Sequence, residues 1–446
     1  MSPPPTHENI LPLAQALNDR LEKAAPEVFG MLSALGRRLY FPKGILTQSA
    51  EAKQKAHRMN ATIGIATEGG GPMHLPSVAS HVDLPPAEVF PYAPPAGQQG
   101  LREAWREKAL AENPGLRGRS FGLPIVTSAI THGLMLAGDL FVDPGDVIVL
   151  PDKLWGNYRL TFEVRLGARI ATYPFFAGQG YDTKGFADAL RAAGEQHEKV
   201  IVMLNFPNNP TGYMPTEAEG AAIVDALVAE AERGTRVLAI LDDAYFGLFY
   251  HLGQESMTQS LFAHLVNRHP NLLALRLDGA TKELFVWGLR CGFFTLGPGR
   301  ADTADEVCDV IEAKVKGAIR SAISNIPQIS QSLVSHALAA PTIDAERDAK
   351  IETLRARAEK VYAIANEPRF RESWNVYPFN SGYFMCVETL GVEAERLRVH
   401  LLDAFGIGTI ATGTHDLRIA FSCLELDEIE PLFEALHQAI QELRSG

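Results

Sequence analysis

The sequence of 446 residues has little cysteine, and the few cysteines are not clustered. Cys291, Cys308, Cys386 and Cys423 lie far apart and form no Cys-x-x-Cys pair. A disulfide framework and a cysteine-based zinc site are therefore not expected, and no other metal site is predicted. This usage of cysteine fits a reducing, cytoplasmic compartment.

The chain also lacks long apolar and basic stretches. No segment approaches roughly 18 uninterrupted apolar residues, so no membrane span is expected. The start of the chain, "MSPPPTHENI", has three consecutive prolines and no apolar run, unlike a signal peptide. The formal net charge is −12, without a basic stretch to offset it. Nucleic acid is therefore not an expected partner, and we predict a soluble protein.

What the middle of the chain does have is an alternation of short apolar runs with helix-like segments, such as 216–233. This alternation predicts βαβ units and a mostly parallel sheet with helices on both faces. Near-continuous apolar strands fit burial on both sides. The seven predicted strands are 124–129, 146–151, 168–175, 199–206, 236–245, 271–279 and 291–297.

After about residue 298 the pattern changes to long helices and a few strand-like pieces, which predicts a second, smaller α+β domain. We therefore expect an α/β fold with a three-layer large domain and a smaller α+β domain. The predicted parts are an N-terminal segment 1–75 that joins the small domain, since chain ends often meet, a large domain 76–325 and a small domain 326–446. The later predicted elements are helices 301–323, 343–366 and 427–444 and strands 381–389 and 415–422.

Polar residues follow several of the predicted strands. In open parallel sheets, ligands bind outside the carboxyl ends of the strands, so these residues should meet at one edge. They come from five loops that are distant in sequence: Thr131, Trp155, Asn209, Asp242 with Tyr245, and Lys282.

The chemistry that these groups could share is specific. A lysine in a dry pocket has a lowered pKa and can form an imine with an aldehyde. An acid such as Asp242 can keep a pyridine nitrogen protonated, so that the ring takes up electrons. A helix N-terminus near Thr131, with Arg290 eight positions after Lys282, could hold a phosphate. Singly, each residue has an ordinary explanation, such as a lysine that reaches solvent. Together they describe a pyridoxal phosphate site.

These motifs resemble those of the fold-type I pyridoxal phosphate enzymes, and within them the class I and II aminotransferases, especially the aspartate aminotransferase group. The resemblance runs from about residue 60 to the end of the chain. It is carried by "NNPTGY", "DDAYFG" and "KELFVWGLRCG". It implies that Lys282 binds the cofactor covalently, that Asp242 pairs with the pyridine nitrogen, and that Asn209 and Tyr245 contact the ring hydroxyl.

The same resemblance implies the remaining cofactor contacts. "LWGNY" is similar to the family's Trp-Gly-Asn-His, with Trp155 over the ring. "FPYAPPAGQQGLREA" looks like the segment whose tyrosine, here Tyr92, reaches the phosphate of the neighbouring subunit of a homodimer. The phosphate contacts within one chain would be Ala129, Ile130, Thr131, Thr281 and Arg290.

Three further segments bear on the substrate, beside Asn209 and Trp155. "DLRIAFS" resembles the strand whose arginine, here Arg418, grips the substrate α-carboxylate. "AIRSAISNIP" resembles the segment whose arginine, here Arg320, reads a side-chain carboxylate across the dimer interface. A solvated basic face explains Arg320 nearly as well. "MNATIGIATEGGGPMHLPSV" looks like the family's N-terminal hairpin, with Gly64 near the substrate.

The sequence departs from the family pattern at three positions. Gly279 stands where a serine usually precedes the lysine by three residues, Ala129 replaces a serine of the phosphate loop, and Tyr158 replaces a histidine behind the ring acid. Ser128 and Thr281 are candidates to compensate for the lost hydroxyls.

Three functions are compatible with these residues. The first is an aminotransferase that passes the amino group of aspartate, or of another dicarboxylic or aromatic L-amino acid, to a 2-oxo acid such as 2-oxoglutarate by a ping-pong mechanism. The second is a lyase that uses the same Lys282 and Asp242 for β-elimination or decarboxylation. The third is a non-enzymatic sensor, disfavoured because no segment remains for a DNA-binding module.

Overall fold

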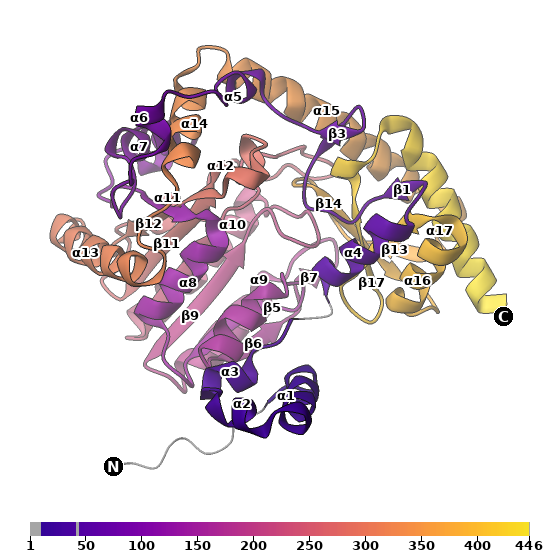
Figure 1. Cartoon of the computed structure of the whole chain (residues 1–446), viewed down its shortest axis with the longest axis horizontal. Coiled ribbons are helices and arrows are strands. Elements are labelled where there is room, and N and C mark those ends of the chain that lie inside the picture. The colour runs from indigo at the N-terminus through magenta and orange to yellow at the C-terminus, as the bar shows by residue number, and fades with distance from the viewer. Residues whose placement is uncertain (1–9, 42–43, 446) are drawn as a thin grey trace.

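A seven-stranded sheet forms the centre of the molecule in the computed structural model, which describes residues 10–41 and 44–445 (Figure 1). Residues 1–9 and 42–43 of the predicted N-terminal segment lie outside the described residues. The strand order is β4-β12-β11-β10-β9-β5-β6. All seven predicted strands are confirmed, as β4 (Ile125–Ser128), β5 (Val147–Pro151), β6 (Arg169–Tyr173), β9 (Lys199–Asn205), β10 (Arg236–Asp242), β11 (Leu272–Gly279) and β12 (Cys291–Gly297).

The sheet is parallel except for β12, which pairs antiparallel with both β11 and β4. Successive side chains of the central strand β9 enter different apolar clusters: Val200 and Val202 belong to one, and Ile201 and Met203 to the other. Both faces of the sheet are therefore buried, as the continuous apolar strands predict.

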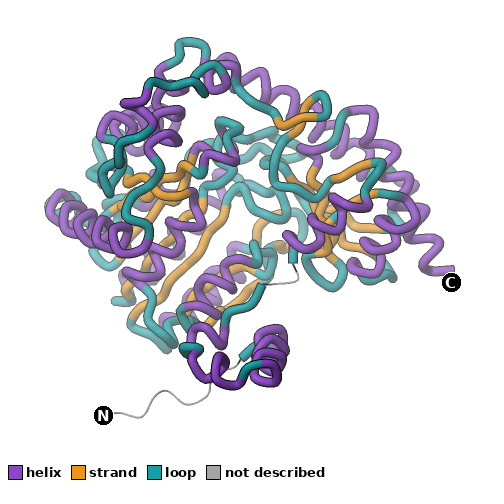
Figure 2. Tube along the Cα trace, viewed as in Figure 1, coloured by secondary structure: helices purple, strands orange, loops and turns teal. Residues whose placement is uncertain are grey.

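Helices pack on both faces of the sheet and produce a three-layer arrangement, which is visible in Figure 2. Helix α8 crosses β4, β11 and β12, whereas α9 and α10 pack on β5, β6, β9, β10 and β11. The predicted α/β fold class is thereby confirmed. The helices of this part are α7 (Gln99–Glu112), α8 (Ala129–Phe141), α9 (Thr183–Gly194), α10 (Glu217–Glu232), α11 (Leu261–Leu265), α12 (Ala280–Glu283), α13 (Ala304–Ala322) and α14 (Gln328–Ala339).

The C-terminal part carries its own antiparallel sheet of four strands, in the order β13-β14-β17-β16. The strands are β13 (Trp374–Val376), β14 (Phe384–Thr389), β16 (Ile410–Ala411) and β17 (Asp416–Ala420). Helices α15 (Ile343–Ala365), α16 (Ala394–Phe405) and α17 (Ile429–Ser445) accompany them. The sequence predicts that Ile429, Leu432, Phe433, Leu436, Ile440 and Leu443 form one apolar face of α17; the first five are buried, and Leu443 is partly buried near the end of the helix.

The N-terminal residues divide between the two sheets. Strand β1 (Met59–Asn60) pairs parallel with β15 (Ile407–Gly408), and α4 (Ile45–Lys55) packs on β15, β16 and α16. By contrast, α1 (Pro12–Ala24), α2 (Pro26–Met31) and α3 (Ala34–Arg38) form a separate group near β6 (Figure 1). Arg38 donates to the carbonyl of Arg165, in the π-helical segment Arg159–Arg165 before β6.

Along the chain, the short elements β2 (Thr67–Glu68), β3 (Gly71–Pro72), α5 (Pro76–Ala79) and α6 (Pro86–Val89) follow β1, and α5 and α6 pack against α14. The hairpin β7 (Phe176–Ala177) and β8 (Gly180–Tyr181) follows β6. No helix in the described part of the chain is long and apolar enough to cross a membrane.

Gly212 marks a close approach between the loop that follows β9 and strand β14 of the C-terminal sheet. Its φ is +74°, and a Cβ added there would lie 2.0 Å from the carbonyl oxygen of Phe384. Its own carbonyl accepts hydrogen bonds from the backbone amides of Asn380 and Ser381. Only glycine allows the loop that follows β9 to approach β14 this closely.

We expect Gly212→Ala to lower the free energy of unfolding by about 3 kcal/mol, because it combines backbone strain with overpacking. Gly178→Ala is the matched control: Gly178 has a φ of +64° but nothing within 4 Å of an added Cβ, so about 1 kcal/mol is expected. Urea unfolding of both variants measures the difference. Equal losses would show that the approach to Phe384 is not restrictive.

Candidate active site

A cavity of about 280 Å³ lies at the carboxyl ends of the parallel strands. The loops after β4, β5, β9, β10 and β11 all reach it, as expected for the carboxyl edge of a parallel sheet. Because β12 runs in the opposite direction, its first residues lie at the same edge, and Arg290 directly precedes them. The predicted residues that line the cavity are Gly64, Ala129, Ile130, Thr131, Trp155, Asn209, Asp242, Tyr245, Thr281, Lys282, Arg290 and Arg418.

Lys282 lies on the one-turn helix α12, directly after β11. Burial, reinforced by the positive charge of Arg290, lowers the pKa of its amine to about 8, and the Asp242 carboxylate opposes this shift. Its Nζ atom is 5.2 Å from the centroid of the Tyr245 ring. A substantial fraction of this amine is therefore neutral, and nucleophilic, near physiological pH.

Asp242 ends β10 and is buried. Burial raises the pKa of its carboxyl to about 6, although the hydroxyl of Tyr158 donates a 2.5 Å hydrogen bond to Oδ2 and so favours the ionised form. The backbone amide of Ala244 donates to Oδ1 at 3.1 Å. A protonated ring nitrogen beside this acid would keep it ionised.

Several groups converge as an anion cradle. Helix α8 begins at Ala129, and its first backbone amides carry the positive end of the helix dipole. The Thr281 hydroxyl is buried without a hydrogen-bond partner, and Arg290 adds a guanidinium from a left-handed backbone position with φ 51°. A phosphate would satisfy these donors, so the residues present fit the phosphate end of the expected cofactor.

Arg418 enters the cavity from β17 of the C-terminal sheet. Its Nη1 donates to Oδ1 of Asn209 at 3.0 Å, and its Nη2 donates to the carbonyl of Thr62 at 2.8 Å. The guanidinium lies over the Phe384 ring, 4.1 Å from the centroid, and its buried Nε has no partner. Among the described residues only two of its five N–H groups have acceptors, so the guanidinium keeps donors for an anionic group.

Two predicted residues lie outside the cavity of this chain. Tyr92 is 90% exposed, and the exposed Arg320 on α13 bonds only to Ser324 among the described residues. Their predicted roles depend on a second subunit and stay predictions.

Four cavity residues were not singled out from the sequence: Ile45, Asn205, Ala244 and Phe384; Tyr158, expected behind the ring acid, also lines the cavity. Asn205 is a polar residue at the carboxyl end of β9, so the strand-end rule could have found it. Its amide donates to the carbonyl of Asp242 at 2.9 Å. Ile45 comes from the helix α4 of the N-terminal part, and no local sequence signal points to it.

The structure gives physical accounts of the departures from the family pattern. A Cβ at Gly279 would lie 2.9 Å from the carbonyl oxygen of Cys291, so the close approach of β12 leaves no room for a serine. Thr281 presents a free hydroxyl in the cavity, whereas Ser128 does not line it. Tyr158 supplies the hydrogen bond to the ring acid.

Residues 85–436 match the family model described as "Aminotransferase class I and II". The chain belongs to this family. Both the family and the fold are those of enzymes that transfer nitrogenous groups. Among solved structures, an aminotransferase from Anaerococcus prevotii has a TM-score of 0.79 at 21% identity and covers 92% of this chain and 99% of its own.

Curated relatives of the chain have different substrates in their names. The cytoplasmic aspartate aminotransferase of Saccharomyces cerevisiae is 24% identical over 49% of this chain and 50% of its own length. The aspartate aminotransferase of Pseudomonas aeruginosa is 24% identical over 72% of this chain and 76% of its own. A probable N-succinyldiaminopimelate aminotransferase of Mycobacterium tuberculosis is 26% identical over 83% of this chain and 80% of its own length. The comparisons therefore define the family but leave the substrate open.

We expect Lys282 of the cofactor-free protein to react with trinitrobenzenesulfonate with a pH midpoint near 8. Burial lowers the pKa of its amine from the ordinary lysine value of 10.5, so the reactive neutral amine forms at a lower pH. Lys184 is the control: it is exposed, and Asp188 raises its pKa. Mass spectrometry of peptides after brief labelling at several pH values gives both midpoints. A midpoint for Lys282 as high as that of Lys184 would contradict the assigned environment.

Proposed function

We propose that the chain is a pyridoxal phosphate-dependent aminotransferase that moves the amino group of an L-amino acid to a 2-oxo acid. The observation that carries the proposal is the half-buried Lys282, with its lowered pKa, in one cavity with Asp242 and the anion cradle. When bound, pyridoxal phosphate supplies an aldehyde for imine formation and a pyridine ring that takes up electrons.

Each residue then has a task that follows from its position. Asp242 would hold a proton at the ring nitrogen, and Tyr158 and Asn205 would fix the orientation of Asp242. Asn209 and Tyr245 would face the ring hydroxyl, and Trp155 would cover the ring. Thr281, Arg290 and the N-terminus of α8 would hold the phosphate.

The remaining groups act on the substrate. Arg418 would bind the α-carboxylate and so orient the bond that breaks. The neutral Nζ of Lys282 would take the proton from the substrate α-carbon as general base and return it as general acid. Phe384 and Tyr245 exclude water around these groups, because both are buried at the cavity wall.

For the substrate, we propose a dicarboxylic or aromatic L-amino acid, with aspartate first and 2-oxoglutarate as acceptor. Two curated relatives named as aspartate aminotransferases support aspartate. Within the described residues of one chain, the cations that line the cavity are Lys282, Arg290 and Arg418. A cation for a second carboxylate would therefore come from the partner's copy of Arg320.

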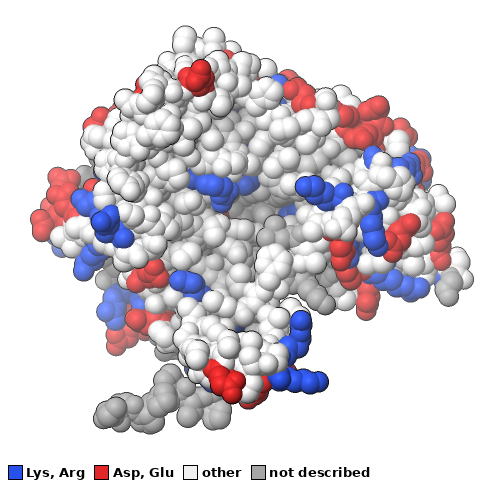
Figure 3. Space-filling model, in the orientation of Figure 1, with Lys and Arg blue, Asp and Glu red and all other residues white. Residues whose placement is uncertain are grey.

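A homodimer with shared active sites is part of this proposal. Val82, Phe90 and Tyr92 are 64%, 80% and 90% exposed and form an apolar segment near α6. A second copy of the chain would cover such a surface. Figure 3 shows that the face viewed in Figure 1 is hollowed near its centre, with basic side chains at the rim. The cytoplasmic location stays a prediction.

We expect Lys282→Ala to lower transamination by at least about 1,000-fold, since it removes both the imine-forming amine and the acid–base group. The assay loads the protein with pyridoxal phosphate, adds L-aspartate, and follows the visible spectrum before and after 2-oxoglutarate. Lys199→Ala is the control and should retain activity, because Lys199 begins β9, at the end of the strand far from the cavity. Near wild-type turnover by Lys282→Ala would exclude the proposal, and pyruvate or carbon dioxide released without an acceptor would favour a lyase.

We expect Arg320→Leu to lower kcat/KM for aspartate about 10- to 100-fold, the effect of losing one hydrogen-bonded charge, and to spare phenylalanine. Lys316→Leu removes the same charge from the same helix one turn away and should affect neither substrate selectively. Steady-state kinetics with both amino donors measures the ratio. An equal loss for both donors would assign Arg320 to another role.

A further inference from the structure

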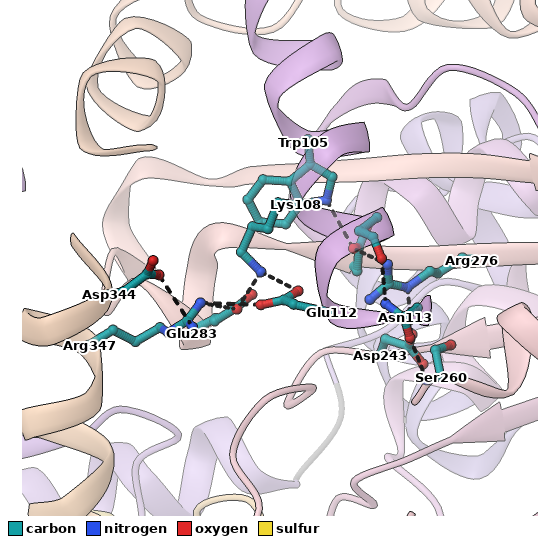
Figure 4. Close-up of polar contacts among 12 residues, drawn as sticks. Trp105, Lys108, Glu112, Asn113, Asp243, Ser260, Arg276, Glu283, Asp344 and Arg347 are labelled. Atoms are coloured by element: carbon teal, nitrogen blue, oxygen red, sulfur yellow. Dashed lines mark hydrogen bonds and ion pairs between the residues drawn. The ribbon is translucent and has the colours of Figure 1, made fainter. Parts of the chain in front are cut away.

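A largely buried ionic cluster surrounds Glu283, the residue that follows Lys282, and takes no part in the steps described above (Figure 4). It joins Lys108 and Glu112 of α7, Glu283 of α12 and Arg347 of α15, and we call it the Glu283 cluster. Nζ of Lys108 lies 2.5 Å from Oε1 of Glu283 and 2.6 Å from Oε2 of Glu112. Nη1 of Arg347 lies 3.1 Å from Oε1 of Glu283 and 3.2 Å from Oε1 of Glu112.

The helix α12 needs support from outside. It has only four residues, and a single helical turn is not stable by itself because nucleation is unfavourable. Within it, the amide of Leu284 donates to the carbonyl of Ala280 at 3.0 Å. From the C-terminal part, the hydroxyl of Tyr383 donates to the carbonyl of Lys282 at 2.9 Å.

Glu283 supplies the support on the opposite side. Consecutive residues of a helix point about 100° apart, so Lys282 can face the cavity while Glu283 faces α7 and α15. The Glu283 carboxylate is anchored by both cations of the cluster at the same oxygen, Oε1. This anchoring fixes the rotation of the turn and thereby the direction of the lysine side chain.

The charges of the cluster balance, with two cations facing two carboxylates. The Glu283 side chain is only 7% exposed, so its charge requires these partners. Burial and the nearby Glu112 carboxylate raise the pKa of Glu283 to about 7, against the effect of Lys108 and Arg347. Asp344 also faces the cluster, 3.5 Å from Nη2 of Arg347. Loss of the Glu283 charge would leave Lys108 and Arg347 with the Glu112 carboxylate inside the cluster and the exposed Asp344 as the remaining nearby anion.

A second group of polar contacts connects α7 to the end of β10, the strand that carries Asp242 (Figure 4). Asp243, the residue after Asp242, pairs with Arg276 at 2.7 Å, and Arg276 lies 3.2 Å from Asp278. Trp105 of α7 donates to Asp278 at 2.9 Å. Helix α7 thus braces the residues next to both the lysine and the ring acid.

We propose that Glu283 is a positioning residue for Lys282, which holds α12 against α7 and, through Arg347, against α15. The proposal rests on the proposed function, in which Lys282 is the reacting amine. The role of Glu283 is to keep the amine where the substrate α-carbon will lie, and small displacements of such a group lower the rate strongly.

The test variant is Glu283→Gln, which keeps the shape of the side chain and removes its charge. In the cofactor-free protein, hydrogen–deuterium exchange of the peptide covering 280–289 should become at least about 10-fold faster, while β9 and β10 remain protected. In the loaded enzyme, kcat should fall about 10- to 100-fold, with KM for the amino donor changed less than about threefold.

Glu230→Gln is the matched control, because Glu230 is a buried carboxylate of α10 that pairs with Arg233 and does not contact α12. It should lower Tm as Glu283→Gln does, yet leave kcat and the exchange of 280–289 at wild-type values. If Glu283→Gln does not fold, Glu283→Asp replaces it as the test variant, since it keeps the charge but shortens the side chain. Exchange of 280–289 should then become faster and kcat should fall, each by less than in Glu283→Gln.

Wild-type exchange at 280–289 together with wild-type kcat in the Glu283 variant would overturn the proposal. Equal effects of Glu230→Gln would overturn it too, since they would reduce Glu283 to a general contribution to stability. Exchange is measured without cofactor or substrate, so this result holds even if Lys282→Ala excludes transamination. The two proposals can therefore fail separately.

Discussion

The partial burial of Lys282, which lowers the pKa of its amine, is the constraint on which the rest of the site depends. An ammonium group held away from water is costly unless it loses its proton or gains a partner. At this position Arg290 repels the charged form and Asp242 stabilises it, and the balance favours a neutral amine above about pH 8. The surrounding structure therefore has to bring together a water-poor edge of the sheet, the opposite charges of Arg290 and Asp242, and the rigid turn α12.

The sheet topology supplies that edge. Five parallel strands end beside the cavity. Because β12 runs in the opposite direction, it starts at the same edge and brings Arg290 close to Lys282. The C-terminal sheet completes the cavity with Arg418, and the close approach of Gly212 to Phe384 holds the loop that carries Asn209 against β14. The cavity is thus built from both sheets.

Much of this arrangement could be predicted from the sequence, because it follows from local patterns. Continuous apolar runs predict the seven buried strands, and the strand-end rule brings Thr131, Asn209, Asp242 and Lys282 together. What could not be predicted depends on contacts between distant segments. Ile45 reaches the cavity only because α4 packs on the C-terminal part, and the pairing of Glu283 with Lys108 and Arg347 has no periodic signal. The roles of Tyr92 and Arg320 depend on a second chain.

The origin of the Lys282 pKa has a consequence for how the enzyme matures. Since burial is the main cause of the shift, the same lysine in an unfolded or newly synthesised chain has an ordinary pKa and is almost fully protonated. An aldehyde in solution then has no reason to prefer it over any other lysine. If Lys282 forms the proposed imine, selectivity for this amine would arise only once α12 is in place, and the finished fold would decide which amine becomes modified.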